Sequence, residues 1–417
     1  MALQPTRNNQ RAPFFVRARR ERALAHAALL CVAACGAQHA LARDFNACVA
    51  GLRAEATAKG IAAQTFDQAL AGVVPDESVL DAMGNQPEFK TPIWDYLAGL
   101  VDEQRVADGR ARLEQWSAVL ADAEQKFGVD RHTIVAVWGV ESDFGRIMGG
   151  RPLVRSLATV SCFGGRQAFF RGELLATLRI LQSGDIAPEA LVGSWAGAFG
   201  QTQFMPTTFQ RLAVDFDGDG RRDIVASVPD ALGSTANFLK RAGWISGQSW
   251  GYEVRLPESY GGPSGRRTRQ PLSAWSKLGI THIDRTPLTG SGAAALLLPA
   301  GAQGPAFIVF RNFDAIYSYN AAESYALAIA HLSDRLRGAG PFATAWPTDD
   351  PGISRVERRE IQERLTARGY DIGNADGIVG PRTRAAIEAF QAASGLPVDG
   401  RAGARSLRAL RESAPRR

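Results

Sequence analysis

The residue of this chain best placed for acid–base chemistry is Glu141, which follows an almost wholly apolar stretch. Positions 134–140 carry only apolar or small side chains, and Asp130, a residue type favoured at helix N-caps, precedes them. A helix without a polar face is buried all round, so we expect Glu141 to emerge from a core. Gly145 is placed to end this helix, leaving Glu141 near the negative end of its dipole. Both features disfavour the ionised carboxylate, which predicts a raised pKa and a general acid; the alternative is a solvated or salt-bridged Glu.

A second dense stretch, residues 194–206, combines small residues, amides and aromatic rings. Small side chains at positions 196, 197, 198 and 200 let a backbone or a ligand approach closely. Gln201 and Gln203 supply amide donors and acceptors beside aromatic side chains such as Phe199. This combination suits a sugar, whose hydroxyl groups form hydrogen bonds and whose ring faces stack. The alternative is a tightly packed contact between elements.

Residues 215–223 match the start of an EF-hand calcium loop. Acids stand at positions 1, 3, 5 and 9 of the loop, and Gly220 stands at position 6. Position 12, where a bidentate Glu belongs, is Ala226, so the nearest acid able to close a longer loop is Asp230. A structural Ca²⁺ is therefore predicted within residues 215–230, a metal-free Asp/Gly turn being the alternative. The predicted ligands are Asp215, Asp217, Asp219, Arg221 and Asp230.

Composition and charge narrow the class of protein. The 417 residues are 45% hydrophobic and 22% charged, typical of a globular chain with about two or three domains. Residues 1–42 carry a net charge of +5 and residues 351–417 another +5, so the part between them is acidic, at −4. The chain shows no basic patch with interleaved aromatics, and we expect no nucleic-acid partner. A basic C-terminal region beside an acidic one suits an anionic wall or surface, and solvated charge explains it equally well.

The N-terminus is typical of an export signal. Six arginines precede an apolar run from Ala23 to Ala34, and residues 40–42 fit a small-residue cleavage site. We therefore predict a signal peptide over residues 1–42 and a periplasmic protein. Residues 32–35 also resemble a bacterial lipobox, and lipidation of Cys35 would anchor the protein to the outer membrane. A membrane is expected as a partner only in that case.

Cysteine usage agrees with export. After cleavage at Ala42 the chain keeps two cysteines, Cys48 and Cys162. In an oxidising compartment they form either one disulfide or two free buried thiols.

The elements around these residues indicate a mainly α (α+β) fold. Helical patterns dominate residues 45–336, interrupted by an extended connector over 86–96 and a Gly-rich, strand-containing insertion from about 250 to 310. Residues 338–352 are rich in Gly and Pro and predict a linker. Three helices follow within residues 353–412, and two similar Asp-Gly turns between them indicate a weak internal repeat.

Four motifs in register resemble the membrane-bound lytic murein transglycosylase B family over residues 45–337. They are Trp138-Gly-Val-Glu141-Ser-Asp-Phe-Gly, the stretch from Ser194 to Pro206, the loop from Asp215, and Tyr319-Asn320. Phe199 stands where Met is expected, which is a tolerable apolar exchange. The tail, with Asp376-Gly-Ile-Val-Gly-Pro and Gly395-Leu-Pro-Val-Asp-Gly, resembles the three-helix peptidoglycan-binding domain of wall enzymes.

The resemblance implies a lysozyme-like catalytic domain over residues 43–337 that cleaves the β-1,4 bond between N-acetylmuramic acid and N-acetylglucosamine. Glu141 would serve as acid and then base, closing the C6 hydroxyl on C1 to leave a 1,6-anhydro end, with no cofactor needed for the chemistry. The matching substrate-binding positions are Ser194, Gln203, Asn320, Tyr325 and Tyr319. The implied partners are peptidoglycan glycan strands and complexes for cell-wall synthesis or hydrolysis.

Two other functions stay open from the residues. One is a muramidase on the same fold, which would use water; the other is a non-catalytic peptidoglycan-binding protein. Hydrolysis ordinarily uses two carboxylates, and the near neighbour Asp143 should point to a different face. A linker before the tail further predicts that residues 353–417 retain the enzyme on sacculi and that cleavage of short glycans hardly depends on them.

Overall fold

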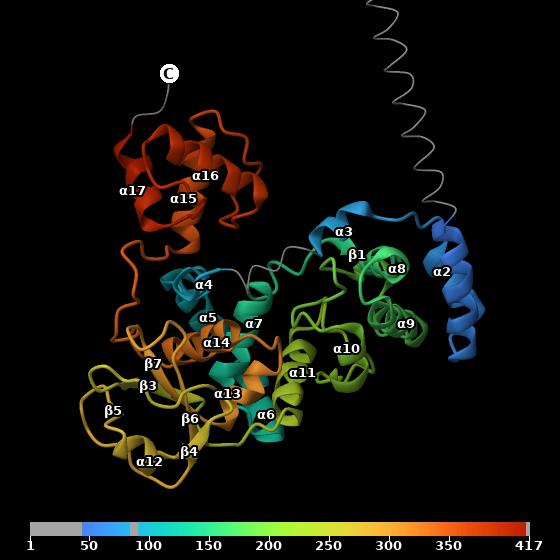
Figure 1. The fold of residues 1–417 in the computed structure, drawn as a ribbon. Helices are drawn as coiled ribbons and strands as arrows, with labels where there is room; N and C mark the ends of the chain where they lie inside the picture. Colours follow the sequence, from blue (N-terminus) through green and yellow to red (C-terminus); the bar gives the residue numbers. More distant parts are fainter. Residues whose placement is uncertain (1–43, 84–90, 414–417) are drawn as a thin grey trace, which may run out of the picture.

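The computed structural model describes residues 44–83 and 91–413, so the predicted signal peptide and Cys35 lie outside the described residues. The fold is mainly helical with a small antiparallel β insertion, which confirms the predicted class (Figure 1). No helix in the described part of the chain is both long and apolar enough to cross a membrane. The buried apolar side chains form four clusters: two lie within residues 45–336, a third within residues 254–308 and a fourth within residues 353–410.

The helices before the β insertion contribute to the first two clusters. In chain order they are a helix over residues 44–58, α2 (Ala63–Leu70), α3 (Glu77–Ala82), α4 (Ile93–Leu100), α5 (Glu103–Gln115), α6 (Ser117–Phe127), α7 (Arg131–Ser142), α8 (Leu153–Phe163), α9 (Gln167–Ser183), the 3-10 turn η2 (Pro188–Ala190), α10 (Pro206–Leu212) and α11 (Val228–Arg241). The extended connector predicted over residues 86–96 is wrong from Ile93 onward, because α4 begins there and buries Leu97 in the core.

The β insertion is a five-stranded antiparallel sheet in the order β4-β6-β7-β3-β5. Its elements are β3 (Gly251–Arg255), β4 (Arg269–Pro271), α12 (Leu272–Lys277), β5 (Thr281–His282), β6 (Ala293–Leu297) and β7 (Ala306–Val309). Every residue of β7 is buried, as expected of a central strand with both faces covered. A separate pair, β1 (Arg151–Pro152) and β2 (Val192–Gly193), joins Arg151 to Gly193 and Pro152 to Val192. The chain then returns to the helical core through α13 (Arg311–Tyr317) and α14 (Glu323–Leu336).

Helix α7 lies at the centre of the molecule, beside α14 (Figure 1). Asp130 caps its N-terminus, with Oδ1 accepting a hydrogen bond from the Thr133 amide at 3.0 Å, as the sequence predicts. Residues 133–139 are all buried. The predicted end at Gly145 is wrong, because the helix stops at Ser142 and Asp143 takes the left-handed conformation with φ of 52°. Aspartate tolerates this conformation better than most side chains.

The C-terminal domain consists of α15 (Arg355–Thr366), α16 (Pro381–Ala393) and α17 (Ala404–Glu412) around its own apolar cluster. The weak repeat has a physical basis in two buried glutamines, Gln362 and Gln391. Each accepts a hydrogen bond from the glycine amide of an Asp-Gly turn, Gln362 from Gly377 at 2.6 Å and Gln391 from Gly400 at 2.9 Å. The same clip thus holds both turns against the helices.

The segment before this domain does not keep it at a distance, because α15 packs against α4 (Figure 1). Gly352 lies so close to α4 that an added Cβ would sit 2.5 Å from the Trp94 carbonyl oxygen. Arg401 donates to both carboxylate oxygens of Asp95 at 2.9 Å and to Asp350 at 3.0 Å. Part of the arginine excess in this domain is therefore bound to acids outside it, a use of the charge that neither sequence interpretation included.

Candidate active site

Glu141 lies in the last turn of α7, where the helix emerges from the core. Glu141 is half-buried, whereas residues 133–139 of the same helix are fully buried. Trp138, one turn earlier, packs edge-on against Phe144 at a ring-centroid distance of 5.7 Å. Close packing here requires glycine at position 139, because an added Cβ would sit 2.8 Å from the Phe144 ring.

The Glu141 carboxyl has a raised pKa. Burial raises the pKa from 4.5 to about 8, while the hydrogen bond that the Tyr325 hydroxyl donates to Oε1 acts in the opposite direction. Tyr325 is itself buried on α14, and burial together with the Glu141 charge raises the pKa of its phenol well above 10. The phenol therefore stays protonated at neutral pH and orients the carboxyl. The Glu141 carboxyl, with its raised pKa, holds a proton near pH 7, as a general acid must.

Tyr319 extends this arrangement toward the second motif. Its ring stacks with that of Tyr325 at 6.3 Å and lies 4.4 Å from that of Phe238. Its hydroxyl donates to the carbonyl oxygen of Thr202 at 2.8 Å. Burial and the nearby Glu141 charge raise the pKa of the Tyr319 phenol well above its ordinary value.

The loop after α7 is fastened to the same motif. The Ser142 hydroxyl donates to the Gln201 carbonyl at 2.7 Å and accepts the Gly145 amide at 3.0 Å. Gly145 has φ of 83°, and a Cβ there would sit 2.7 Å from the Gln201 side chain, so position 145 requires glycine. Gln203 donates to the Met148 carbonyl at 3.0 Å. Two motifs far apart in sequence thus contact one another just beyond Glu141, at the end of α7.

The predicted substrate-binding residues do not all contact Glu141. Tyr325 does so directly, and Tyr319 and Gln203 are joined to its surroundings through the contacts above. The Ser194 hydroxyl accepts the Ala198 amide at 3.0 Å within its own turn, and Asn320 is exposed between α13 and α14. Ser142 and Thr202, which tie the motifs together, were not singled out from the sequence, because their contacts cross 59 and 117 residues.

Asp143 is the second carboxylate near the end of α7, and arginines surround it. Arg146 donates to it at 3.0 Å, Arg355 at 2.9 Å, and the buried Arg105 lies 3.5 Å away. Burial disfavours its charge, but the hydrogen bond from Arg146 and the charges of the three arginines outweigh that cost and lower its pKa. The sequence prediction that Asp143 faces away from the Glu141 chemistry agrees with these contacts.

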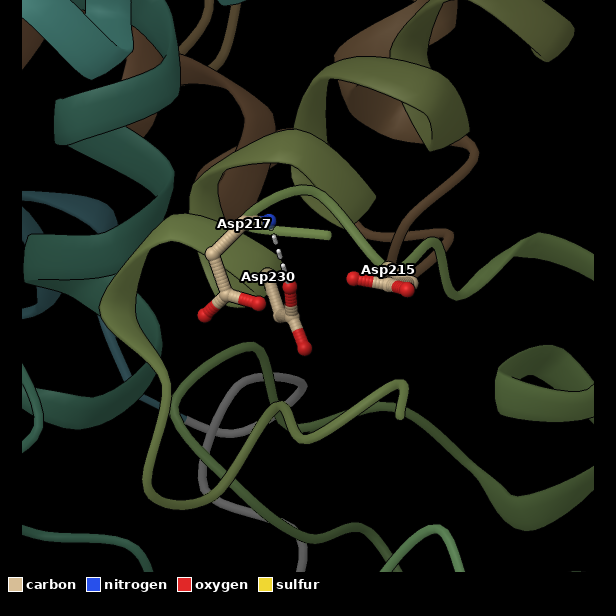
Figure 2. Close-up of side chains that lie close together, drawn as sticks. All are labelled: Asp215, Asp217 and Asp230. Atoms are coloured by element: carbon tan, nitrogen blue, oxygen red, sulfur yellow. Dashed lines mark hydrogen bonds between the residues drawn. The ribbon is translucent and has the colours of Figure 1, made fainter. Parts of the chain in front are cut away.

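The Asp-rich loop brings three of its predicted ligands together. One carboxylate oxygen from each of Asp215, Asp217 and Asp230 lies within 4.8 Å of the others (Figure 2). Asp230 is fully buried, burial raises its pKa, and it accepts the Phe216 amide at 2.7 Å and the Asp223 amide at 2.6 Å. Clustered oxygen ligands of this kind suit a hard cation such as Ca²⁺.

The other two predicted ligands are Asp219 and Arg221, and Arg221 stands at position 7, where an EF-hand loop supplies a backbone carbonyl. Asp219 is exposed and its carboxylate accepts the Arg221 amide at 2.8 Å. The Arg221 side chain turns away and donates to the Asp185 carbonyl at 2.9 Å.

Cys48 and Cys162 are joined. The disulfide Cys48–Cys162 ties the helix over residues 44–58 to the end of α8, with 5.9 Å between the two Cα atoms. Of the two arrangements open from the sequence, the structure thus contains the bridged one.

Comparisons with known proteins agree with this architecture. Residues 44–334 match the family described as Transglycosylase SLT domain, and residues 354–410 match a putative peptidoglycan binding domain. The chain is 34% identical over 267 residues to membrane-bound lytic murein transglycosylase B of Escherichia coli (strain K12), covering 61% of this chain and 73% of that one.

Solved structures extend the match across both regions. SltB3 from Pseudomonas aeruginosa, determined in complex with NAG-NAM-pentapeptide and with NAG-anhNAM-pentapeptide, is 48% identical with a TM-score of 0.71, covering 88% of this chain and 99% of that one. Slt35 from Escherichia coli, determined in complex with calcium, is 31% identical with a TM-score of 0.62. The match covers 70% of this chain and 92% of that one. The chain therefore belongs to the transglycosylase SLT domain family and is a lytic murein transglycosylase that acts on peptidoglycan.

Proposed function

We propose that the enzyme cleaves the β-1,4 bond between N-acetylmuramic acid and N-acetylglucosamine without using water. In this reaction Glu141 acts first as the general acid and then as the general base. The observation that carries this is the position of the Glu141 carboxyl at the end of α7, where the Tyr325 hydroxyl donates a hydrogen bond to it and burial raises its pKa. Glu141 gives its proton to the glycosidic oxygen as the C1–O bond breaks. The ionised carboxylate then accepts the proton of the muramoyl C6 hydroxyl, whose oxygen bonds to C1 and forms the 1,6-anhydro ring.

The surroundings of Asp143 support a one-carboxylate mechanism. A hydrolase of the ordinary kind uses a second carboxylate as base or nucleophile. Asp143 is the acid nearest in sequence, but three arginines bind it and its pKa is lowered. The Glu141 carboxyl, by contrast, accepts a hydrogen bond from the Tyr325 hydroxyl, and burial raises its pKa.

Mass spectrometry of the muropeptides released from purified sacculi tests this proposal. The expected products carry anhydromuramoyl ends and are lighter by one water molecule than hydrolysed ones. Reducing ends would instead indicate a muramidase. Binding without any product, from folded protein, would indicate a non-catalytic wall-binding protein.

The sugar contacts belong to the residues around Glu141. We assign them to Tyr325 and Tyr319, to Gln203, and to Ser194 and Asn320 on the neighbouring turns. The tyrosine rings offer apolar faces, and Gln203, whose amide nitrogen donates to the Met148 and Gly200 carbonyls, offers its side-chain oxygen as a hydrogen-bond acceptor for a sugar. The relative SltB3 was determined with NAG-NAM-pentapeptide, which supports a glycan at this surface.

The Asp-rich loop is proposed to hold a structural Ca²⁺ through Asp215, Asp217 and Asp230, with Asp219 and Arg221 as its outer members. The relative Slt35 was determined in complex with calcium, and the three clustered carboxylates fit that ion. Calcium should raise the melting temperature by mass action, and Asp230→Asn should remove that rise. Asp371→Asn, at an exposed acid of the C-terminal domain, is the control; an unchanged melting temperature in calcium and in chelator would argue against the ion.

The remaining assignments concern domains and location. We propose a signal peptide over residues 1–42, a catalytic domain over 43–337, a linker over 338–352 and a peptidoglycan-binding domain over 353–412. Export to the periplasm, with or without a lipid at Cys35, agrees with the name of the Escherichia coli relative, which is membrane-bound. The mass of the mature N-terminus would distinguish the two cleavages. Participation in wall-synthesis or hydrolysis complexes stays a prediction.

A further inference from the structure

The C-terminal domain places a cation beside the end of the helix that carries Glu141. Arg355, the first residue of α15, donates through Nη1 to Asp143 Oδ2 at 2.9 Å. Asp143 is only two residues beyond Glu141. Arg355 is about one-fifth exposed and Asp143 less, so solvent screens this ion pair only in part.

Arg355 is fixed by contacts on both domains. Its amide donates to Asp102 Oδ2 at 3.2 Å, and Asp102 is the residue that caps α5. Its Nε donates to the Asp376 carbonyl at 3.2 Å, within the C-terminal domain. The side chain that reaches Asp143 is therefore held at its base by the catalytic domain and along its length by its own domain.

Asp143 in turn fixes the end of α7. Its amide donates to the Gly139 carbonyl at 3.1 Å, and the Phe144 amide donates to the Trp138 carbonyl at 3.3 Å. Arg105 donates to the same Gly139 carbonyl at 2.9 Å while lying 3.5 Å from Asp143. The last turn of the helix, which includes Glu141, is thus held by a network that the Asp143 carboxylate closes.

An unpaired anion would destabilise this turn. A negative charge at a helix C-terminus opposes the helix dipole, and the left-handed backbone of Asp143 adds strain. Arg105, Arg146 and Arg355 supply the compensating charge, and only Arg355 comes from outside the catalytic domain.

We propose that Arg355 is a positioning residue for catalysis, through which the docked C-terminal domain holds Asp143 and the last turn of α7 so that Glu141 stays aligned with its substrate. The proposal rests on the proposed role of Glu141. It replaces the expectation that the C-terminal domain only retains the enzyme on sacculi and hardly affects cleavage of short glycans.

Steady-state kinetics of full-length variants on short soluble peptidoglycan oligomers test the proposal, with loss of substrate followed by chromatography. Arg355→Gln should lower kcat about threefold to tenfold, leave KM within about twofold, and leave sedimentation with sacculi unchanged. Arg355→Lys keeps the cation for Asp143 and should have an intermediate kcat. The matched control is Arg364→Gln, because Arg364 is also on α15 but pairs with Glu360 inside its own domain.

Several results would overturn the proposal. They are a wild-type kcat for Arg355→Gln, a loss confined to KM, an equal loss for Arg364→Gln, and a Lys variant as slow as the Gln variant. Glu141→Gln measured in parallel separates the two claims. If it is inactive while Arg355→Gln is fully active, only the positioning role fails; if it keeps turnover, the role of Glu141 fails and the positioning role falls with it.

Discussion

Glu141 and Asp143 stand two residues apart at the end of α7, and their surroundings shift the pKa values of the two carboxyl groups in opposite directions. Glu141 accepts a hydrogen bond from the Tyr325 phenol, and burial raises the pKa of Glu141 to about 8. Asp143 is also partly buried, but Arg146, Arg105 and Arg355 surround it and lower its pKa. One group is suited to carry a proton and the other to carry a permanent charge.

The difference shows that partners, and not burial alone, decide the protonation state. Both side chains lose hydration, which disfavours the ionised form of each. Only Asp143 has cations close enough to reverse the effect. The end of α7 therefore carries a proton donor, Glu141, and a permanently charged carboxylate, Asp143, that binds arginines.

The largest expected effect comes from removing the proton carrier. Glu141→Gln keeps the size and can still accept the Tyr325 hydrogen bond, but it cannot transfer a proton. Turnover of sacculi should fall by about 10³-fold or more, while sedimentation with sacculi is retained. Turnover close to that of the wild type would show that Asp143 or another group is the acid.

The stability of the protein should reveal the same carboxyl. Its pKa is 4.5 ordinarily and about 8 in the fold, so between these pH values the native state holds a proton that the unfolded chain has released. The Glu141 contribution to the free energy of unfolding therefore becomes less favourable as pH rises through this window. Relative to wild type, Glu141→Gln should be equally stable near pH 4 and more stable above pH 8, by about 2–4 kcal/mol in urea denaturation. Glu363→Gln, at an exposed glutamate, is the control and should show no such trend.

Tyr325→Phe should raise the pKa of Glu141 further and so enlarge its difference from Asp143. The phenol hydrogen bond lowers the Glu141 pKa, so its loss should raise that pKa further and shift the alkaline limb of the kcat–pH profile to higher pH. Poorer orientation of the carboxyl should also lower kcat by about tenfold. Tyr370→Phe in the C-terminal domain is the matched control. An unshifted alkaline limb would contradict the assigned contact.

The smallest expected effect comes from removing the charge of Asp143. Asp143→Asn tolerates the left-handed backbone but removes the charge, and should reduce the free energy of unfolding at pH 7 by about 1 kcal/mol. Because the folded pKa of Asp143 is lowered, its contribution is present above the unfolded value of 3.8 and is lost as pH falls through the folded pKa. The difference between variant and wild type should therefore disappear in acid. A difference that persists there would mean that packing, and not charge, is responsible.

Local patterns in the sequence predicted much of this site. The Asp130 cap, the apolar stretch and the terminal position of Glu141 follow from residue types within one helix, and the structure contains each of them. The internal repeat of the C-terminal domain was also readable, because each copy carries its own Asp-Gly turn. Contacts between residues far apart in the sequence could not be predicted from local patterns. The phenol on Glu141 comes from 184 residues away, and nothing near Glu141 in sequence specifies it.

The errors have physical causes. Gly145 is a favoured helix-ending type, but Asp143 already takes the left-handed conformation and ends the helix at Ser142. The arginines of the tail look in sequence like solvated charge or a wall-binding surface. Arg355 and Arg401 instead bind acids of the catalytic domain, which a Gly/Pro linker gives no reason to expect.

The measurement that tests the central claim most directly is the titration of the Glu141 carboxyl itself. In ¹³C-glutamate-labelled protein, the carboxyl resonance that is absent from Glu141→Gln identifies this group, and its chemical shift can be followed with pH. We expect it to titrate near pH 8, well above the ordinary 4.5. A midpoint near 4.5 would mean that Glu141 is ionised at neutral pH and cannot be the acid of this enzyme.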